Sequence, residues 1–283
     1  MPSFDQVQST FILQNNAPVD VFMGLSANEM HHLLYDTFGD KSPIQFQEQI
    51  DNNTLDKIPI FRILEDYLKI LQREKLIKLT PLGALPKKVM VELYSKGYLP
   101  DDIIEAGITK LSREEDCISI RSARFAAELA RLVKKVNGKL SLTKTALKLL
   151  ETNNRVQLFK QFFQAFALKF SWSYNDLYPE EPIGQLGWGF SLILLDKFGD
   201  HPQTVKFYAD KYAKAFPVLL DIFESEHFSR EDHFFRCYGI RSFDRFFYWF
   251  GLVSVEKKKE ILNLENDTFQ KTELIKQLFK LDI

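Results

Sequence analysis

A pattern of helix, short β-favouring run, turn and second helix occurs three times along this chain. It covers residues 71–94 (LQREKLIKLTPLGALPKKVMVELY), residues 129–151 (LARLVKKVNGKLSLTKTALKLLE) and, less regularly, residues 246–279. In each copy the strand-forming run is too short to build a large sheet, and the flanking helices are longer and amphipathic. The pattern therefore predicts a mostly α-helical fold that carries small β-ribbons.

The copy at residues 129–151 is the most complete. A helix is predicted over 120–135, and the dipeptide Asn137-Gly138 is the strongest hairpin-turn signal in the chain. An alternating Leu-Ser-Leu run and a helix over 143–151 follow. A helix that leads into a two-stranded ribbon and then into another helix is typical of a winged helix, a module that contacts DNA or another protein. We expect winged-helix-like segments in this chain.

These patterns predict three parts. Residues 1–55 form an N-terminal arm and a capping helix, residues 56–155 form the winged-helix-like region, and residues 156–283 form a helical domain with a degenerate third winged-helix-like segment. Such a length accommodates either two domains or one helical body with small modules attached.

The N-terminal part is expected to begin with an extended arm that lies on the body. Pro18 and the asparagines before it disfavour a helix within residues 10–25. Ser26 and Glu29 then have the spacing of a capping box, in which each side chain hydrogen-bonds to the backbone amide of the other residue. The capped helix is predicted over residues 27–36.

Phenylalanine is the residue type that most shapes the C-terminal part. The chain contains 26 Phe, and many of them lie in helical runs. Large aromatic rings at helical spacing indicate a core filled by rings rather than an aromatic cage for a ligand. Helices are expected over 155–171, 186–198, 204–224 and 230–250, with Pro217 kinking or splitting the third.

The charge of the chain is uneven, although the net charge is only −1. Residues 56–160 hold 21 Lys and Arg against 13 Asp and Glu, whereas the residues before and after this stretch are acidic overall. A local excess of cations favours contact with phosphate, but a solvated Lys-rich surface is the simpler interpretation. Net charge near zero disfavours indiscriminate nucleic-acid binding.

The candidate residues for nucleic-acid binding lie in and after the helix over 120–135. They are Arg121, Arg124, Arg131, Lys134, Lys135, Lys139 and Lys144. The spacing of Arg124, Arg131 and Lys135 places them on one helix face, where they would meet the major groove while the later lysines meet phosphates. Glu128 is four residues from Arg124 and is placed to pair with it instead. A third alternative is that the arginines pack inward and leave no face for a groove.

Three stretches resemble segments of a family of uncharacterised bacterial proteins that have a winged-helix-like stretch and a helical body. They are Asn15-Asn16-Ala17-Pro18 with Gly24-Leu25-Ser26 and Met30-His31-x-Leu33-Leu34-Tyr35, then Leu79-Thr80-x-x-Gly83-x-Leu85-Pro86, then Gly138-Lys139-Leu140-x-Leu142-Thr143-Lys144. The resemblance runs over most of the chain. It implies a cytoplasmic bacterial protein and a winged helix, and it brings no catalytic residues. Some relatives carry cysteine-rich SEC-C metal-binding modules, which two cysteines cannot form.

The residues that could carry chemistry are sparse. The histidines are His31, His32, His201, His227 and His233. His233 and Cys237 share a helix face, but no recognised metal-binding order surrounds them, so no metal and no cofactor are predicted. The phosphate-binding glycine loops and nucleophile motifs of common enzymes do not occur in this sequence.

Two features bear on the cellular location. Cys117 and Cys237 are far apart and have no metal-type spacing, so we expect reduced, buried thiols. The sequence contains neither a signal-peptide pattern at its start nor an apolar run of the length that crosses a bilayer. A cytoplasmic protein is therefore expected, without a membrane partner and with an oligomeric state that the sequence leaves open.

The sequence favours a non-enzymatic binding or regulatory protein whose winged-helix-type module contacts DNA or a partner protein. The alternative is an enzyme of unrecognised type, with a site between the two halves of the chain near His31, His32, His227 or His233. A deep polar pocket with converging carboxylates and histidines would favour the enzyme, and an exposed basic surface would favour the binding module.

Overall fold

The computed structural model of the chain describes residues 3–176, 178–180, 182–222, 229–257 and 266–282. Helices account for 56% and strands for 11% of the structure, which confirms the mostly α-helical prediction. Within the described residues the strands form three small antiparallel sheets, ordered β1-β8, β2-β4-β3 and β5-β7-β6.

The helices are α1 (Phe4–Asn15), η1 (Asp20–Phe22), α2 (Ala27–Tyr35), α3 (Asn52–Asp56), α4 (Pro59–Glu74), α5 (Lys87–Tyr94), α6 (Asp102–Glu105), η2 (Glu114–Asp116), α7 (Ile118–Leu129), α8 (Lys144–Glu151), α9 (Arg155–Leu168), η3 (Trp172–Asn175), α10 (Trp188–Phe198), α11 (Val205–Ala215), α12 (Val218–Asp221), α13 (Arg230–Tyr238), the π-helix η4 (Gly239–Phe247) and α14 (Leu274–Leu278). The strands are β1 (Ile44–Phe46), β2 (Ile77–Lys78), β3 (Val133–Val136), β4 (Lys139–Leu142), β5 (Gln203–Thr204), β6 (Val253–Glu256), β7 (Thr268–Lys271) and β8 (Phe279–Leu281).

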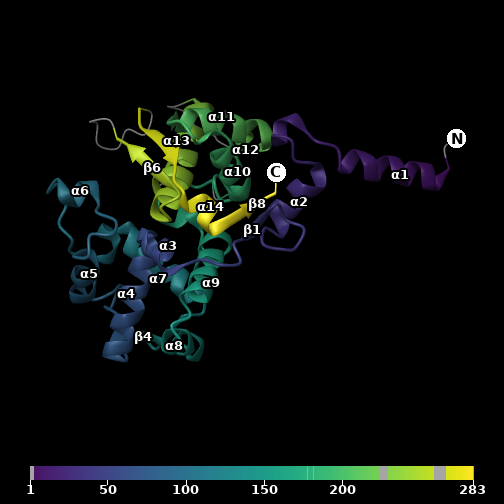
Figure 1. The fold of residues 1–283 in the computed structure, drawn as a ribbon. Coiled ribbons are helices and arrows are strands. Elements are labelled where there is room, and N and C mark those ends of the chain that lie inside the picture. The colour runs from purple at the N-terminus through teal and green to yellow at the C-terminus, as the bar shows by residue number, and fades with distance from the viewer. Residues whose placement is uncertain (1–2, 177, 181, 223–228, 258–265, 283) are drawn as a thin grey trace.

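The first three-stranded sheet joins two of the sequence repeats. β3 and β4 form a hairpin around Asn137 and Gly138, whose positive φ angles of 49° and 68° suit the predicted tight turn. The sequence predicts a separate ribbon in each repeat, but β2 from the first repeat pairs with β4 from the second. We call residues 59–142 unit 1; along the chain its main elements are α4, β2, α5, α7 and the β3–β4 hairpin (Figure 1).

A second group of elements repeats this order, and we call it unit 2 (residues 188–271). It runs from α10 through β5 and α11 to α13, which continues as η4, and ends in the β6–β7 hairpin. Its sheet order, β5-β7-β6, matches that of unit 1, with the short first strand beside the last one. The third sequence repeat therefore supplies the end of η4 and the hairpin of unit 2, and the rest comes from residues that the repeat pattern does not include.

The N-terminal arm differs from its prediction. The sequence predicts an extended segment lying on the body, whereas α1 is a helix that points away from the body (Figure 1). Ser3 and Gln6 form a capping box that starts this helix, and Asn16 with Pro18 ends it, so the breaker acts only at its C-terminus. The capping box at Ser26 and the helix after it, α2, are confirmed.

The core is filled by aromatic rings, as predicted, and Phe163 of α9 lies at its centre. Its side chain is fully buried. Seven rings have centroids within 4.7 to 6.2 Å of its own: those of Phe38, Phe46, Phe159, Trp188, Phe246, Phe250 and Phe279. One continuous cluster of buried apolar residues runs through the three predicted parts of the chain. The boundaries at residues 55 and 155 stay predictions.

We expect Phe163→Ala to lower the free energy of unfolding by about 3–5 kcal/mol, because the cavity would sit among seven rings that cannot all move inward. Denaturant unfolding followed by circular dichroism measures this loss. Leu82→Ala is the control, since Leu82 is 91% exposed and its truncation is expected to change stability by less than about 0.5 kcal/mol. Equal effects of the two substitutions would contradict the central place of Phe163.

Candidate nucleic-acid interface

The sheet of unit 1 has one buried face and one face covered by lysines. Ile77 of β2 and Leu140 of β4 are paired across the sheet and are buried in the core. Because neighbouring residues on a strand point to opposite faces, Lys78 and Lys139 lie on the solvent side, together with Lys134 of β3. We call Lys78, Lys134 and Lys139 the lysine face.

Two of these lysines oppose each other directly. Lys78 of β2 is the cross-strand partner of Lys139 of β4. Directly opposite residues have Cβ atoms about 4.5–5.5 Å apart, and two like charges in this position destabilise a sheet. Within the described residues neither lysine is in an ion pair, so no carboxylate offsets the repulsion. An anion placed on this face would offset it.

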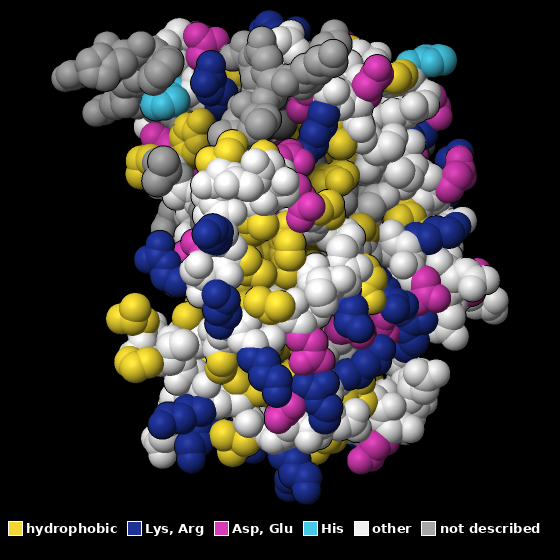
Figure 2. All heavy atoms as spheres, turned by 90° about the vertical axis from the view of Figure 1, so that its left-hand side faces the viewer, with side chains coloured by type: hydrophobic (Ala, Val, Ile, Leu, Met, Phe, Trp, Pro, Cys, Tyr) yellow, Lys and Arg dark blue, Asp and Glu magenta, His cyan; other side chains and the backbone are white. Residues whose placement is uncertain are grey.

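Further cations follow α7 along the chain. Arg131, Lys135 and Lys144 are exposed, and the described part of the chain gives none of them an acidic partner. Two other cations in and beside unit 1 are neutralised: Arg73 binds both oxygens of Glu92, and Arg155 binds both oxygens of Glu65. Figure 2 shows Lys and Arg side chains gathered in the lower half of one side of the molecule, the half that contains unit 1, with Asp and Glu among them.

The sheet of unit 2 lacks a comparable surface in the part that the structure describes. Lys271 of β7 is largely buried and pairs with Asp196 and Asp200. The pair next to it, the exposed Ser254 and the half-buried Gln270, is neutral. The two units therefore share the order of their elements, but among the described residues their sheets differ in charge.

Helix α7 does not present the predicted basic face. Most of its side chains are buried, since it packs against α4 on one side and against α9 on another. Arg121 is half-buried, with its guanidinium over the ring of Tyr174 at 4.6 Å. Arg124 is only 3% exposed. The sequence places Arg124 on one helix face with Arg131 and Lys135 and leaves open that it packs inward or pairs with Glu128; the structure shows the buried, paired arrangement.

The helix also ends earlier than predicted. It stops at Leu129, and Arg131 takes a left-handed conformation with φ of 57°. The amides of Arg131 and Leu132 donate to the carbonyls of Glu128 and Ala127, which is the Schellman pattern of a helix end. The sequence gives no glycine to signal this end. Lys134 and Lys135 consequently belong to strand β3 and not to the helix.

Arg124 forms a buried ion-pair cluster. Its Nε and Nη2 atoms donate to the two carboxylate oxygens of Glu114 at 2.5 and 3.1 Å, and its Nη1 donates to Glu128 at 2.9 Å. Glu114 also accepts from the amide of Leu85 at 2.9 Å. Burial lowers the pKa of Arg124, but the two carboxylates outweigh burial and hold the pKa above its usual value. This cluster ties α7 to the segment before it and engages all three guanidinium nitrogens of Arg124 with carboxylates.

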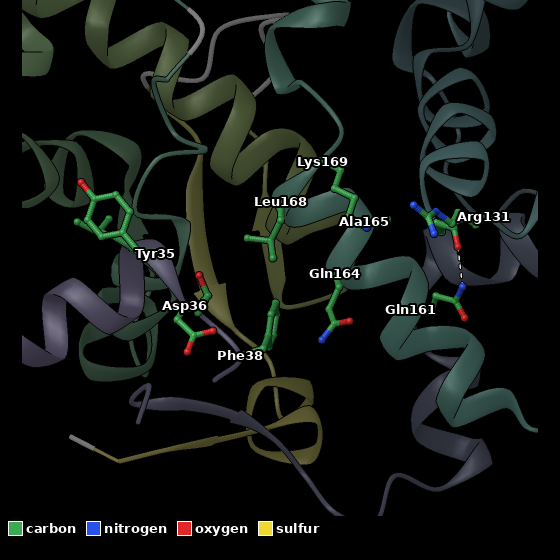
Figure 3. A pocket seen from close by; sticks show the side chains of 12 residues that line it. Tyr35, Asp36, Phe38, Arg131, Gln161, Gln164, Ala165, Leu168 and Lys169 are labelled. Carbon is green, nitrogen blue, oxygen red and sulfur yellow. Dashed lines mark hydrogen bonds between the residues drawn. The ribbon is translucent and has the colours of Figure 1, made fainter. Parts of the chain in front are cut away.

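A groove runs along the C-terminal half of α9. Its first part has a volume of about 490 Å³ and lies between the segment after α2 and the segment after α7. Figure 3 shows Tyr35 and Asp36 on one side of α9 and Arg131 and Gln161 on the other. A second part of about 460 Å³ adjoins it and shares Leu168 and other lining residues. We call the two parts together the α9 groove. Its described lining holds one carboxylate and no histidine.

The remaining candidates for chemistry are not brought together. His31 and His32 lie on α2 with ring centroids 5.8 Å apart, and His227 lies outside the described residues. His233 contacts the ring of Tyr178. Among the described residues no group of three or more His, Cys, Asp or Glu side chains is arranged to hold a metal ion.

The two cysteines are buried and unbonded, as predicted. Burial raises the pKa of Cys237 to about 12 and also raises the pKa of Cys117. Both thiols are therefore protonated near neutral pH, and a protonated thiol is a poor nucleophile and a poor metal ligand. These cysteines contribute to packing.

Lys78 of the lysine face is not among the candidate residues predicted from the sequence. Lys78 belongs to the strand-forming run of the first repeat, but nothing in the sequence reveals that this run pairs with β4. Alternation in Leu76-Ile77-Lys78-Leu79 could have indicated that Lys78 is exposed. Its place opposite Lys139 depends on the tertiary fold.

The chain matches no protein-family model, no curated protein and no solved structure. Among the described residues, no helix combines the length and the apolar character that crossing a membrane requires.

We expect Arg124→Ala to lower the free energy of unfolding by about 3–5 kcal/mol, because Glu114 is 1% exposed and would keep a buried charge without its partner. The control is Arg73→Ala, which breaks the ion pair with Glu92 at the surface and is expected to cost less than about 1 kcal/mol. Chemical denaturation of both variants measures the difference. A loss for Arg124→Ala no larger than that of the control would contradict the buried ion-pair cluster.

Proposed function

We propose that the protein is a non-enzymatic, DNA-binding regulatory protein, and that unit 1 is a winged helix that holds duplex DNA through its lysine face and wing. The single observation that carries this proposal is the pair Lys78 and Lys139, placed opposite each other on an exposed sheet face with no carboxylate partner in the described residues. Phosphate groups are the anions that would relieve this repulsion in a nucleic-acid complex.

The order of elements supports the winged-helix assignment. The three longer helices of unit 1 are α4, α5 and α7. The short strand β2 lies between the first and the second of them along the chain, and the β3–β4 hairpin follows the third. The short strand pairs with the outgoing strand of the hairpin, an order that supports the assignment of the hairpin as a wing. Unit 2 has the same order, so the chain carries this arrangement twice.

The mode of contact differs from that of a typical winged helix. In a helix-turn-helix protein the third helix reads base edges in the major groove. Here α7 is covered by α9 and its Arg124 is engaged by Glu114, so α7 offers no groove-reading face. Contacts through lysines of a sheet and wing reach phosphates, which position DNA but carry little sequence information. The proposed binding is therefore governed by the DNA backbone and is sensitive to salt.

The same proposal places the protein in the bacterial cytoplasm. Two free, buried thiols suit a reducing compartment, where disulfides are rare. The enzyme alternative finds less support, because the α9 groove is open and holds a single carboxylate among its described lining residues.

We expect purified protein to bind mixed-sequence duplex DNA with an affinity that falls steeply as salt rises. In the triple variant Lys78→Ala/Lys134→Ala/Lys139→Ala, the slope of log affinity against log salt should become shallower by about 2–3, since each phosphate contact contributes about 0.9. Fluorescence anisotropy across a salt series measures both slopes.

Two controls sharpen this experiment. Lys206→Ala/Lys214→Ala/Lys280→Ala removes the same charge from exposed sites outside unit 1 and should leave the slope unchanged. Arg121→Ala alters α7 and should also leave the slope unchanged. A large effect of this substitution would indicate that α7 contacts the DNA. If the native protein binds no DNA at low salt, the proposed function is wrong and a protein partner becomes the better candidate for the lysine face.

A further inference from the structure

Helix α1 is the segment whose apolar surface is least accounted for by the fold. The side chains described along it are all exposed, including Phe4 at 81%, Phe11 at 59%, Ile12 at 55% and Leu13 at 73%. The helix extends away from the body in Figure 1. Solvent exposure of several large apolar side chains on one short segment indicates an interaction surface.

A helix of this length is not stable by itself. Isolated helices shorter than about 12–15 residues are marginal in water, and most helices in proteins are stabilised by packing of an apolar face. α1 has 12 residues, and its capping box contributes only at its N-terminus. A partner that covers its apolar side chains would therefore stabilise the helix.

The segment that follows α1 is attached to the rest of the protein by hydrogen bonds. The side-chain amide of Asn28 donates to the side-chain oxygen of Asn16 at 2.9 Å, directly after the helix. Pro18 and Ser26 form an isolated bridge, and Lys197 donates to the carbonyl of Met23. The link between α1 and α2 is thus attached to the body, and the helix leaves the body from that attachment. A surface on another molecule is the partner that this geometry favours.

The distribution of apolar side chains favours a groove over a simple helix pair. Successive residues on a helix are turned by about 100°, so Ile12 and Leu13 face different sides, while Phe4 and Phe11 share one side. A coiled-coil seam covers one narrow stripe only. Covering the apolar side chains near the end of α1 requires a partner surface that encloses more than one side of the helix.

The α9 groove has the chemistry to accept this helix. Its lining includes the apolar side chains of Leu34, Leu168 and Leu186, of which Leu168 is 48% exposed. It also includes the cations Arg131 and Lys169 against one carboxylate, Asp36. α1 carries an acidic residue and no cation, and the first basic residue of the chain is Lys41. The charges of helix and groove are complementary.

We propose that the chain forms a reciprocal dimer in which α1 of each copy lies in the α9 groove of the other copy. Phe4 and Phe11 pack on the leucines of the groove, and the acidic N-terminal turn of α1 lies near its cations. The interface is isologous, since each copy contributes one helix and one groove. None of the three residues of the lysine face lines the α9 groove, so self-association and DNA binding can be tested with different variants.

The first test is the oligomeric state of the full chain by analytical ultracentrifugation. The native chain, of 33.1 kDa, is expected to sediment with about twice that mass. Phe4→Gln/Phe11→Gln/Leu13→Gln should shift it to the mass of one chain, and Leu168→Glu should do the same from the groove side. The matched control Val91→Gln/Ile108→Gln/Val218→Gln changes three other exposed apolar residues and should leave the dimer intact. Circular dichroism checks that every variant is folded.

The second test identifies the surface that α1 occupies. Protein with Phe11→Cys is mixed with protein carrying Leu168→Cys and oxidised mildly; both native thiols are buried. A disulfide between the two different chains is the expected product, and Val218→Cys in place of Leu168→Cys should give none. A native chain that stays monomeric at high concentration, a dimer that survives the α1 variant, or cross-linking only between two Phe11→Cys chains would each overturn the proposal.

Discussion

The packing of α9 against α7 is the contact on which the rest of the arrangement depends. α7 carries small buried side chains, among them Ala123, Ala126 and Ala127, which allow a second helix to approach closely. α9 carries Phe163, which lies at the centre of the aromatic core. Because α9 joins unit 1 to this core, helix α7 of unit 1 becomes an interior element of the molecule.

That burial determines which cations are left for a ligand. An interior helix cannot keep an unpaired arginine, so Arg124 is neutralised by Glu114 and Glu128. On the sheet of unit 1, Lys78 and Lys139 remain exposed and repel each other across two neighbouring strands. The same fold therefore buries the arginine of the helix and leaves lysines exposed on the sheet. The proposed function follows from this difference between the buried Arg124 and the exposed lysines of the sheet.

Local features of this chain could be predicted from the sequence, and long-range ones could not. The capping box of Ser26 and Glu29 was predictable because its hydrogen bonds span three residues. The end of α7 was missed because Arg131 adopts a left-handed conformation without the usual glycine. The lysine face was seen only in part, since Lys78 and Lys139 are far apart in the sequence and meet through strand pairing. The spacing of apolar residues along the sequence predicts neither the exposed position of α1 nor the groove that we propose for it, because both depend on the tertiary fold.

The most direct test of the central claim is acetylation footprinting of the full chain with and without duplex DNA, read residue by residue by mass spectrometry. Acetylation of Lys78, Lys134 and Lys139 is predicted to fall severalfold when DNA is bound, because their ammonium groups would contact phosphates. Lys206 and Lys280 lie outside unit 1 and should react equally in both states. Unchanged acetylation of the lysine face, under conditions in which DNA is bound, would contradict the account.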